Sequence, residues 1–399
     1  MEHFSKKLNW HHAAMQGAFW AGFNALWGYI SVFLLFKGFS NGQIGLISSL
    51  ALVLPTVIQP ALASLSDHSI RFNSRRVAAI LVCVTLGITA VLRTLGNTRW
   101  ITAVCFVLIG TLLQLIAPYF NAIVMEYHLR GIPVNYGFGR GFGSACYAAM
   151  SMGLGFVLEK RSPAVILPIF AVSFALLLLI ILAFRYPLPP LPEAAEKKPE
   201  DCLSNRQILQ NYPTFVLLLI GSALVMASHN TINTYFIHIV GNIGKGETLM
   251  GILMAISAFM ELPSMTLFPY FSSRFSITTL LRLATFGFLG KALLFAFGRS
   301  PVFLYLAALL QFFEFGILQP AMVYYTARLL SVSNLVKGQS LFHLFSNCIG
   351  PAAASLICGF LLDHFGVSAM MLFLISCCVA GLIIIHIATR RKDNSEVTV

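Results

Sequence analysis

Charged residues are scarce in this sequence. Asp, Glu, Lys and Arg together make up 10% of the 399 residues, whereas soluble domains carry about a quarter. Hydrophobic residues make up 58%, and they gather in long uninterrupted runs. So little charge over so long a chain argues against a soluble protein and for one that crosses a membrane.

Sequence motifs that carry enzyme chemistry are also missing. The sequence has no zinc-ligand spacing of Cys and His, no nucleophile–base motif and no glycine-rich phosphate loop. Its eight cysteines lie mostly in apolar segments, so we expect free thiols rather than a disulfide framework or metal ligands. We therefore expect neither an enzyme nor a protein that holds a metal or cofactor.

Apolar runs long enough to cross a bilayer fill the rest of the chain. A run of about eighteen or more residues with few charges is read as a membrane helix. The polar start MEHFSKKLNWHH is followed directly by such a run, so no cleaved signal peptide is expected. The sequence predicts an all-α membrane protein with about twelve spans, over residues 13–36, 43–66, 76–96, 100–127, 137–158, 163–185, 213–238, 247–271, 277–297, 301–329, 337–361 and 366–389.

The excess of positive charge follows the predicted topology. The chain has 26 Lys and Arg against 14 Asp and Glu, a formal net charge of +12. With an even number of spans, one set of loops holds most of the basic residues, among them Lys6, Lys7 and Arg130. The positive-inside rule then places both termini in the cytoplasm. Topology accounts for the charge, so no nucleic-acid partner is expected.

The chain divides into two similar halves. A polar, proline-rich segment, YPLPPLPEAAEKKPEDCLSNRQ, separates the sixth span from the seventh and is read as a linker. GFVLEK at 155–160 is echoed by GFLLDH at 359–364, and VLPTVIQP at 53–60 by ELPSMTLFP at 261–269. We expect six-helix bundles at 1–188 and 213–399 joined by a cytoplasmic linker at 189–212. Two parallel six-helix repeats are the arrangement of major facilitator transporters, whose substrate sits between the halves near mid-membrane.

Polar side chains recur on single faces of several predicted spans. Arg140, Ser144 and Tyr147 follow the spacing of one helical face in the fifth span, and His229 with Asn233 do so in the seventh. Trp20, Asn24 and Trp27 share a face of the first span. Lipid cannot satisfy such groups, so together they indicate a wet interior. The alternative is that individual polar residues only bond one helix to another.

Glu261, Lys291 and Glu314 are ionisable residues that lie well inside predicted spans. An intramembrane charge is a functional hypothesis by default. Glu314 sits in the run LLQFFEFG, among phenylalanines, where burial disfavours the ionised carboxylate. A carboxyl group that can hold a proton is what a proton-coupled carrier needs. The alternative is a fixed structural pair between a glutamate and Lys291.

Several segments resemble the lactose permease branch of the major facilitator superfamily and the related phenylpropionate permeases. QPALASLSD at 59–67, followed by Arg75 and Arg76, is similar to the family's gating loop after span two, which implies a gating role for Asp67, Arg75 and Arg76. YGFGRGFGS at 136–144 resembles the family's segment with the sugar-binding arginine, which falls on Arg140. Tyr147 falls on the position whose ring stacks on the sugar.

The same resemblance extends to the C-terminal half. MELPSMTLF at 260–268 places the family's eighth-span glutamate on Glu261, and LGK at 289–291 places its ninth-span arginine on Lys291. LLQFFEFG resembles the segment that carries the proton-coupling glutamate, which falls on Glu314.

The sequence departs from this family in several places. Ala63 stands where the gating loop has glycine, and Gln311 stands where sugar permeases have histidine. Asn121, in PYFNA, occupies the acidic sugar-binding position of span four, with Glu126 five residues later as the alternative occupant of that role. His229 resembles a histidine of the phenylpropionate permeases.

These observations predict a proton-coupled symporter that imports a small organic solute by alternating access. A sugar or small glycoside is the first choice, and an aromatic acid or a nucleoside is the alternative. Drug/proton antiport is disfavoured because span five lacks the GPxxGG-type motif of many exporters. The expected partners are the solute, protons and the lipid bilayer, for a monomer in a bacterial inner membrane. We expect proton coupling at Glu314, Glu261 and Lys291, and substrate binding at Arg140, Asn121, Ser144, Tyr147, Glu261, His229, Asn233, Gln311, Trp27 and Asn24.

Overall fold

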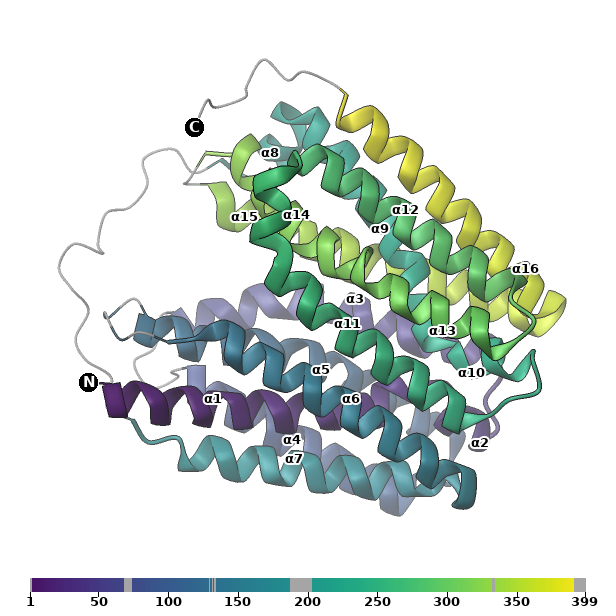
Figure 1. Cartoon of the computed structure of the whole chain (residues 1–399). Coiled ribbons are helices and arrows are strands. Elements are labelled where there is room, and N and C mark those ends of the chain that lie inside the picture. The colour runs from purple at the N-terminus through teal and green to yellow at the C-terminus, as the bar shows by residue number, and fades with distance from the viewer. Residues whose placement is uncertain are drawn as a thin grey trace. The chain divides into compact units, whose positions relative to one another are not determined.

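The computed structural model describes residues 2–67, 74–128, 130, 132, 134–186, 203–331 and 334–390, and these residues form helices and turns without a strand (Figure 1). The chain clusters into two compact units. Unit 1 comprises Met1–Lys197 with Gly246–Ala255, and unit 2 comprises Lys198–Lys245 with Ile256–Val399. Much of the predicted linker at 189–212 lies outside the described residues, and its last part contains a short helix, α8 (Asn205–Asn211).

Unit 1 is built around its first helix. In Figure 1, α1 lies between α6 and α7, and both pack against it. α4 packs on α5 and on α7, and α3 packs on α5. The helices of this unit are α1 (Glu2–Phe23), η1 (Asn24–Gly28), α2 (Ile30–Phe36), α3 (Asn41–Asp67), α4 (Ser74–Leu95), α5 (Arg99–His128), α6 (Tyr136–Lys160), η2 (Pro163–Val165) and α7 (Ile166–Ala183).

Unit 2 is centred on α9 and α12, each of which packs against α16. Phe215, Phe288, Met322 and Cys378 are among the side chains of its continuous apolar core. The other helices of this unit are α10 (Phe236–Gly241), α13 (Pro301–Leu309), η4 (Leu310–Phe312), α14 (Phe315–Leu329), α15 (Leu335–His343) and η6 (Leu344–Ile349), with α9 at Pro213–Thr234, α12 at Ile277–Phe297 and α16 at Gly350–Ala388. α11 (Glu247–Arg274) contributes its residues from Ile256 onward.

The helix starts follow local sequence signals. The Asn135 side chain accepts a hydrogen bond from the backbone N–H of Phe138 and caps α6, and Ser276 caps α12 in the same way through Thr279. Proline occupies the first turn of α9 and α13, where its missing N–H leaves no hydrogen bond unmade. These caps satisfy backbone donors that would otherwise be unpaired at the helix ends.

The number of membrane-crossing helices agrees with the sequence. Ten described helices are long and apolar enough to cross a membrane, and the bent pair Phe4–Gly28 and Ile30–Phe36 makes eleven. One of the ten, Lys337–Ala388, is 52 residues long and turns at Gly366, whose φ of 78° interrupts the helix and favours glycine. Counting that segment as two spans gives the predicted twelve, with the turn between residues 361 and 366 as expected.

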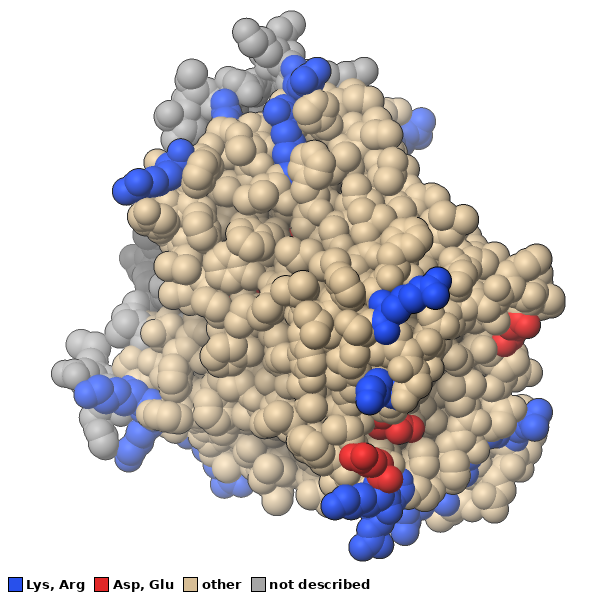
Figure 2. Space-filling view, turned by 45° about the vertical axis from the view of Figure 1, so that its right-hand side comes forward, with Lys and Arg blue, Asp and Glu red and all other residues tan. Residues whose placement is uncertain are grey.

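The surface of the helices is largely apolar. Leu176, Leu179 and Leu182 on α7 and Phe286 on α12 are each at least half exposed. On the face shown in Figure 2, Lys, Arg, Asp and Glu side chains occupy only a few places on a wide uncharged surface. Exposed apolar helices of this length are those of a protein whose solvent is lipid.

One glycine contact in unit 1 is tight enough to test. A Cβ atom at Gly110 would lie 2.7 Å from Ala51 Cβ and against the Trp27 ring, whereas one at Gly87 would meet nothing within 4 Å. Gly110→Ala is expected to destabilise the protein by about 1–3 kcal/mol through overpacking. Gly87→Ala, the matched control, is expected to be neutral or to stabilise by up to about 1 kcal/mol. Thermal unfolding of the two purified variants measures both, and equal midpoints would contradict the packing described.

Candidate functional site

Unit 2 contains a buried chain of hydrogen bonds centred on Lys291. Its Nζ donates to Glu314 Oε1 and to Gln311 Oε1, each at 2.5 Å. Gln311 Nε2 in turn donates to Glu261 Oε1 at 2.8 Å. The amide of Gln311 therefore links Lys291 to a second carboxylate. The three residues that we predicted to couple protons, Glu261, Lys291 and Glu314, lie in one connected network.

His229 extends this network from α9. Its Nδ1 lies 3.4 Å from Glu314 Oε1, and its Nε2 lies 3.3 Å from the amide nitrogen of Asn233, one turn along the helix. If the amide donates to Nε2, then Nδ1 carries the ring proton. Nδ1 has no hydrogen-bond partner among the described residues, so its contact with the carboxylate is electrostatic. The ring stacks on Phe315 at 5.3 Å between centroids and meets the edge of Phe288 at 6.0 Å. His229 and Asn233, predicted as substrate ligands, thus adjoin Glu314, which we predicted to couple protons.

Most side chains of this network are removed from solvent. Lys291, Gln311 and Glu314 are 3%, 2% and 1% exposed, and Glu261 is half-buried. A buried charge is tolerated when it is paired and hydrogen-bonded, and the contact between Lys291 and Glu314 provides this. One carboxylate oxygen, Glu314 Oε2, is buried and has no hydrogen-bond partner among the described residues. That oxygen is the atom on which a proton can be held without breaking an existing bond.

A break in the tenth span places Glu314 in the network. α13 ends at Leu309, the 3₁₀ segment η4 follows, and α14 begins only at Phe315. Glu314 has φ −88° and ψ −90°, outside the α-helical range. Such interruptions often mark functional positions. LLQFFEFG is therefore not the regular helix turn that its apolar run suggests.

Small residues on neighbouring helices make room for the break. A Cβ atom at Gly287 of α12 would lie 3.2 Å from the backbone nitrogen of Glu314, so the two segments approach closely there. Gly316 likewise packs against Ser264 of α11. Ser264 Oγ donates to the Phe312 carbonyl at 2.5 Å and satisfies an acceptor within the interrupted segment.

Unit 1 contains a second polar chain, which includes Arg140. Arg140 Nη1 donates to Ser144 Oγ at 2.9 Å, and its guanidinium lies 4.4 Å from the centroid of the Trp20 ring. Trp20 Nε1 donates to Gln16 Oε1 at 2.9 Å, and Gln16 Nε2 lies 3.2 Å from His12 Nε2. The structure thus brings Arg140 and Ser144 together, as their four-residue spacing predicts.

His12 and Gln16 were not among the predicted site residues. Both precede Trp20 at four-residue intervals and so continue the polar face of the first span that the sequence shows from Trp20 onward. Because α1 begins at Glu2 rather than near residue 13, that face extends further towards the N-terminus than the apolar run indicates. The four-residue spacing was the signal that could have identified these two residues.

The remaining predicted ligands of unit 1 have different surroundings. Asn24 and Trp27 lie in η1, a π-helical turn. Asn24 is fully buried, and neither polar atom of its side chain has a partner among the described residues. Asn121 is exposed on α5, and Tyr147 is half-buried on α6.

The residues predicted to form a gating loop lie at the end of α3 and the start of α4. Arg75 Nη1 donates to the Phe184 carbonyl, and Arg76 is exposed. Asp67 is the last residue of α3, and its side chain lies outside the described set. Glu126 accepts a hydrogen bond from Ser74 Oγ, so its carboxylate has a partner on α4.

Comparison with known proteins agrees with this architecture. The sequence profile of the MFS_1-like family matches residues 17–375. Maltose permease of Geobacillus stearothermophilus is 26% identical over 374 residues, which cover 94% of this chain and 92% of the permease. The uncharacterized transporter YwbF of Bacillus subtilis (strain 168) is 22% identical over 375 residues, covering 93% of this chain and 92% of that protein.

Solved structures show the same fold at low sequence identity. The nucleoside transporter NupG matches with a TM-score of 0.79 at 15% identity over 97% of this chain and all of that one. A bacterial homolog of the human lysosomal transporter Spinster, in an inward-facing and occupied conformation, matches with a TM-score of 0.65 at 15% identity over 97% and 95% of the two chains.

The charge balance of the network predicts an asymmetry between its variants. Lys291→Gln leaves two linked carboxylates without their lysine, and loss of a buried partner costs about 3–5 kcal/mol. The double variant Lys291→Gln/Glu314→Gln removes a charge of each sign and is expected to recover most of that stability. Thermal unfolding in detergent measures the difference.

The control is Lys245→Gln, which removes an exposed lysine of a loop and should leave stability within about 0.5 kcal/mol of the parent. A double variant as unstable as Lys291→Gln alone would show that the pair does not set the stability of this region.

Proposed function

Since this chain belongs to the MFS_1-like family of transporters, we propose that it is a proton-coupled symporter for a small organic solute, with a sugar or small glycoside as the first candidate. The observation that carries this proposal is the buried network of Glu261, Gln311, Lys291, Glu314 and His229. It connects two carboxylates to one lysine.

Protonation would change the charge of this network. Lys291 and Glu314 form a charged pair, and a proton on Glu314 removes one charge of that pair. An unbalanced charge is costly in a water-poor interior, so proton uptake would be coupled to the stability of one state of the carrier. Glu314 Oε2, buried and without a partner among the described residues, is the proposed acceptor.

Protonation would also change the contacts of Lys291. A neutral Glu314 attracts the ammonium group less, while the Gln311 bridge still connects Lys291 to the ionised Glu261. The lysine thus has two alternative anionic partners, and the proton decides between them. A group with two alternative partners is the kind of two-state element through which proton binding can bias an alternating-access cycle.

A sugar is favoured as the solute by two observations. The first is the 26% identity to a maltose permease over nearly the whole chain. The second is that His229 lies 3.4 Å from the Glu314 carboxylate, whose negative charge disfavours the carboxylate of an aromatic acid beside the same ring. Arg140, with its fixed fork of donors, also suits vicinal hydroxyls. Aromatic rings are available near it: Tyr147 lies on the same face of α6, and the Trp20 ring lies beside the guanidinium.

A nucleoside is the second candidate. It presents ribose hydroxyls as well as a planar base, and the exposed Asn121 amide on α5 can donate to and accept from a base edge, which a carboxylate cannot. The likeness to NupG shows the fold and leaves this choice to experiment.

Uptake by proteoliposomes tests the solute and the coupling together. Labelled maltose, a simple glycoside and uridine are compared, each with and without an inward proton gradient.

We also propose that both termini are cytoplasmic in a bacterial inner membrane. The Phe4 ring packs against Tyr186 at 5.5 Å, so the start of α1 and the residues after α7 lie at one end of unit 1. In unit 2, Lys337 Nζ donates to the Leu203 carbonyl at 2.6 Å, which brings the start of that unit beside the start of α15. Basic residues collect at these ends, as the positive-inside rule requires of cytoplasmic loops.

Glu314→Gln is expected to separate coupling from transport. The amide mimics the protonated carboxyl, and the protein should remain folded because Glu261 still compensates Lys291 through Gln311. Accumulation driven by a proton gradient should vanish, since no proton can be released. Exchange of solute at equal concentrations should persist, because exchange requires no deprotonation. Both assays are run on one preparation.

The matched control for this prediction is Glu247→Gln, in the first turn of α11 and outside the network, which should retain both activities. Retained accumulation in Glu314→Gln would disprove proton coupling at this residue. Loss of both activities in a well-folded Glu314→Gln protein would also count against it.

Arg140→Lys is expected to weaken solute binding at least about tenfold without unfolding the protein. A single ammonium group keeps the charge but loses the planar fork and the stacking on Trp20. Lys245→Gln, which removes an exposed charge from a loop, is the control and should leave affinity unchanged. Isothermal titration with the best solute of the uptake screen measures both, and unchanged affinity in Arg140→Lys would remove Arg140 from the binding site.

A further inference from the structure

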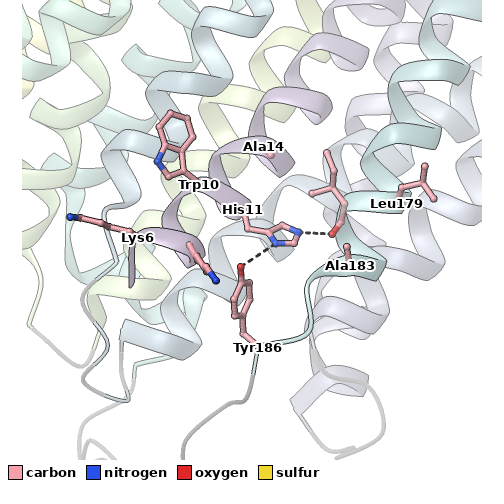
Figure 3. Close-up of a pocket in the computed structure, with 9 residues that line it drawn as sticks. Lys6, Trp10, His11, Ala14, Leu179, Ala183 and Tyr186 are labelled. Carbon is pink, nitrogen blue, oxygen red and sulfur yellow. Dashed lines mark hydrogen bonds between the residues drawn. The ribbon is translucent and has the colours of Figure 1, made fainter. Parts of the chain in front are cut away.

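Between the beginning of α1 and the end of α7 lies a groove that the transport mechanism does not use. Its volume is about 780 Å³, within the range of about 300–1,000 Å³ typical of small-molecule sites. All of its lining residues belong to unit 1. Figure 3 shows Lys6 and Trp10 on α1, His11 at the centre, and Leu179, Ala183 and Tyr186 on the opposite side.

Hydrogen bonds and ring contacts connect the two sides of this groove. His11 Nε2 donates to the Ile180 carbonyl at 2.8 Å, and with that tautomer His11 Nδ1 accepts from the Tyr186 hydroxyl at 3.4 Å (Figure 3). The ring of Phe184 packs edge-on against both His11 and Tyr186. The residue that ties α1 to α7 is thus fixed from two sides.

The groove is cationic at one end. Lys6 and Lys7 line it and are exposed, and Arg185, next to the lining residue Tyr186, is exposed as well. Its described lining holds no carboxylate. This is also the end of unit 1 that the positive-inside rule assigns to the cytoplasm.

The other wall of the groove is apolar and continues into the surface that faces lipid. Leu179 is 63% exposed, and Val172 and Leu176 continue its stripe along α7 at 70% and 53%. Trp10, 61% exposed, stands on the α1 side with its ring against Phe138 at 4.9 Å. A tryptophan beside lysines at a helix end is typical of the membrane–water interface.

We propose that this groove binds one anionic phospholipid, with its phosphate at Lys6 and Lys7 and an acyl chain along Leu179 and the exposed stripe of α7. The positive charge of the two lysines favours an anionic headgroup, and the apolar wall favours an anion that carries an acyl chain. Basic pockets between helices at the cytoplasmic surface are the usual sites of this chemistry. A bound lipid would join α1 to α7 where His11 already connects them.

The test uses the full chain in mild detergent, titrated with dioleoyl phosphatidylglycerol and observed by native mass spectrometry. Each lysine near a headgroup contributes enough that Lys6→Gln/Lys7→Gln should weaken the first bound lipid by about 10- to 30-fold. The matched control, Lys160→Gln/Arg161→Gln, removes the same charge from exposed residues at the other end of unit 1 and should leave that affinity unchanged. Equal losses in the two double variants would mean that net charge alone attracts lipid and would overturn the proposal.

Further experiments distinguish the contribution of the lipid headgroup from that of the acyl chain. Ala183→Phe fills the groove without altering charge and should also reduce phosphatidylglycerol binding at least about tenfold, while dioleoyl phosphatidylcholine should bind the parent protein weakly. Inorganic phosphate at millimolar concentration should not displace the lipid. Displacement by phosphate, or full binding by Ala183→Phe, would show an anion site without a lipid chain and would overturn the proposal.

Discussion

The contact between Lys291 and Glu314 is the constraint around which unit 2 is arranged. Each charge is costly in a membrane interior unless a group of opposite charge compensates it, and Lys291 and Glu314 compensate one another at hydrogen-bond distance. In a regular helix through residues 309–316, Glu314 would have α-helical dihedral angles, whereas its observed φ and ψ are −88° and −90°. The chain instead leaves the α-helical path at Leu310 and resumes it at Phe315. Gly287 allows that segment to approach α12, and Ser264 bonds to a carbonyl within it.

The side-chain amide of Gln311 connects the Lys291–Glu314 pair to Glu261. An amide donates with its nitrogen and accepts with its oxygen, so Gln311 accepts from Lys291 while it donates to Glu261. A histidine at this position could itself hold a proton, whereas an amide cannot. In the proposed mechanism the proton is therefore held by a carboxylate of the network and not at position 311.

The sequence predicted what the membrane itself dictates. Apolar length determines where spans lie, and an ionisable residue within a span marks a functional region, so the twelve segments and the trio of Glu261, Lys291 and Glu314 could be recognised from residue types and spacing. The helix break at Leu310, the contact of His229 with Glu314 and the hydrogen bond between Ser74 and Glu126 could not, because each depends on which helices are neighbours in space. His12 and Gln16 fall between these cases: their four-residue spacing is visible in the sequence, but only the helical start at Glu2 places them on the same face as Trp20.

The polar chains of the two units differ in a way that bears on their roles. In the described part of unit 1, Arg140 contacts a hydroxyl and an indole ring rather than a carboxylate, and an arginine stays charged at any pH that a cell experiences. Its donors are thus constant, which suits recognition of a solute. The chain in unit 2 contains two carboxylates, a lysine and a histidine, all of them groups that have a charged and a neutral form. Under the proposed function, a group with constant charge recognises the solute and a group whose charge can change takes up the proton. If one group had both tasks, each protonation step would also change the affinity for the solute. The two polar chains stand on different helices, so under this proposal the proton acts on the conformation, and the conformation acts on access to the solute.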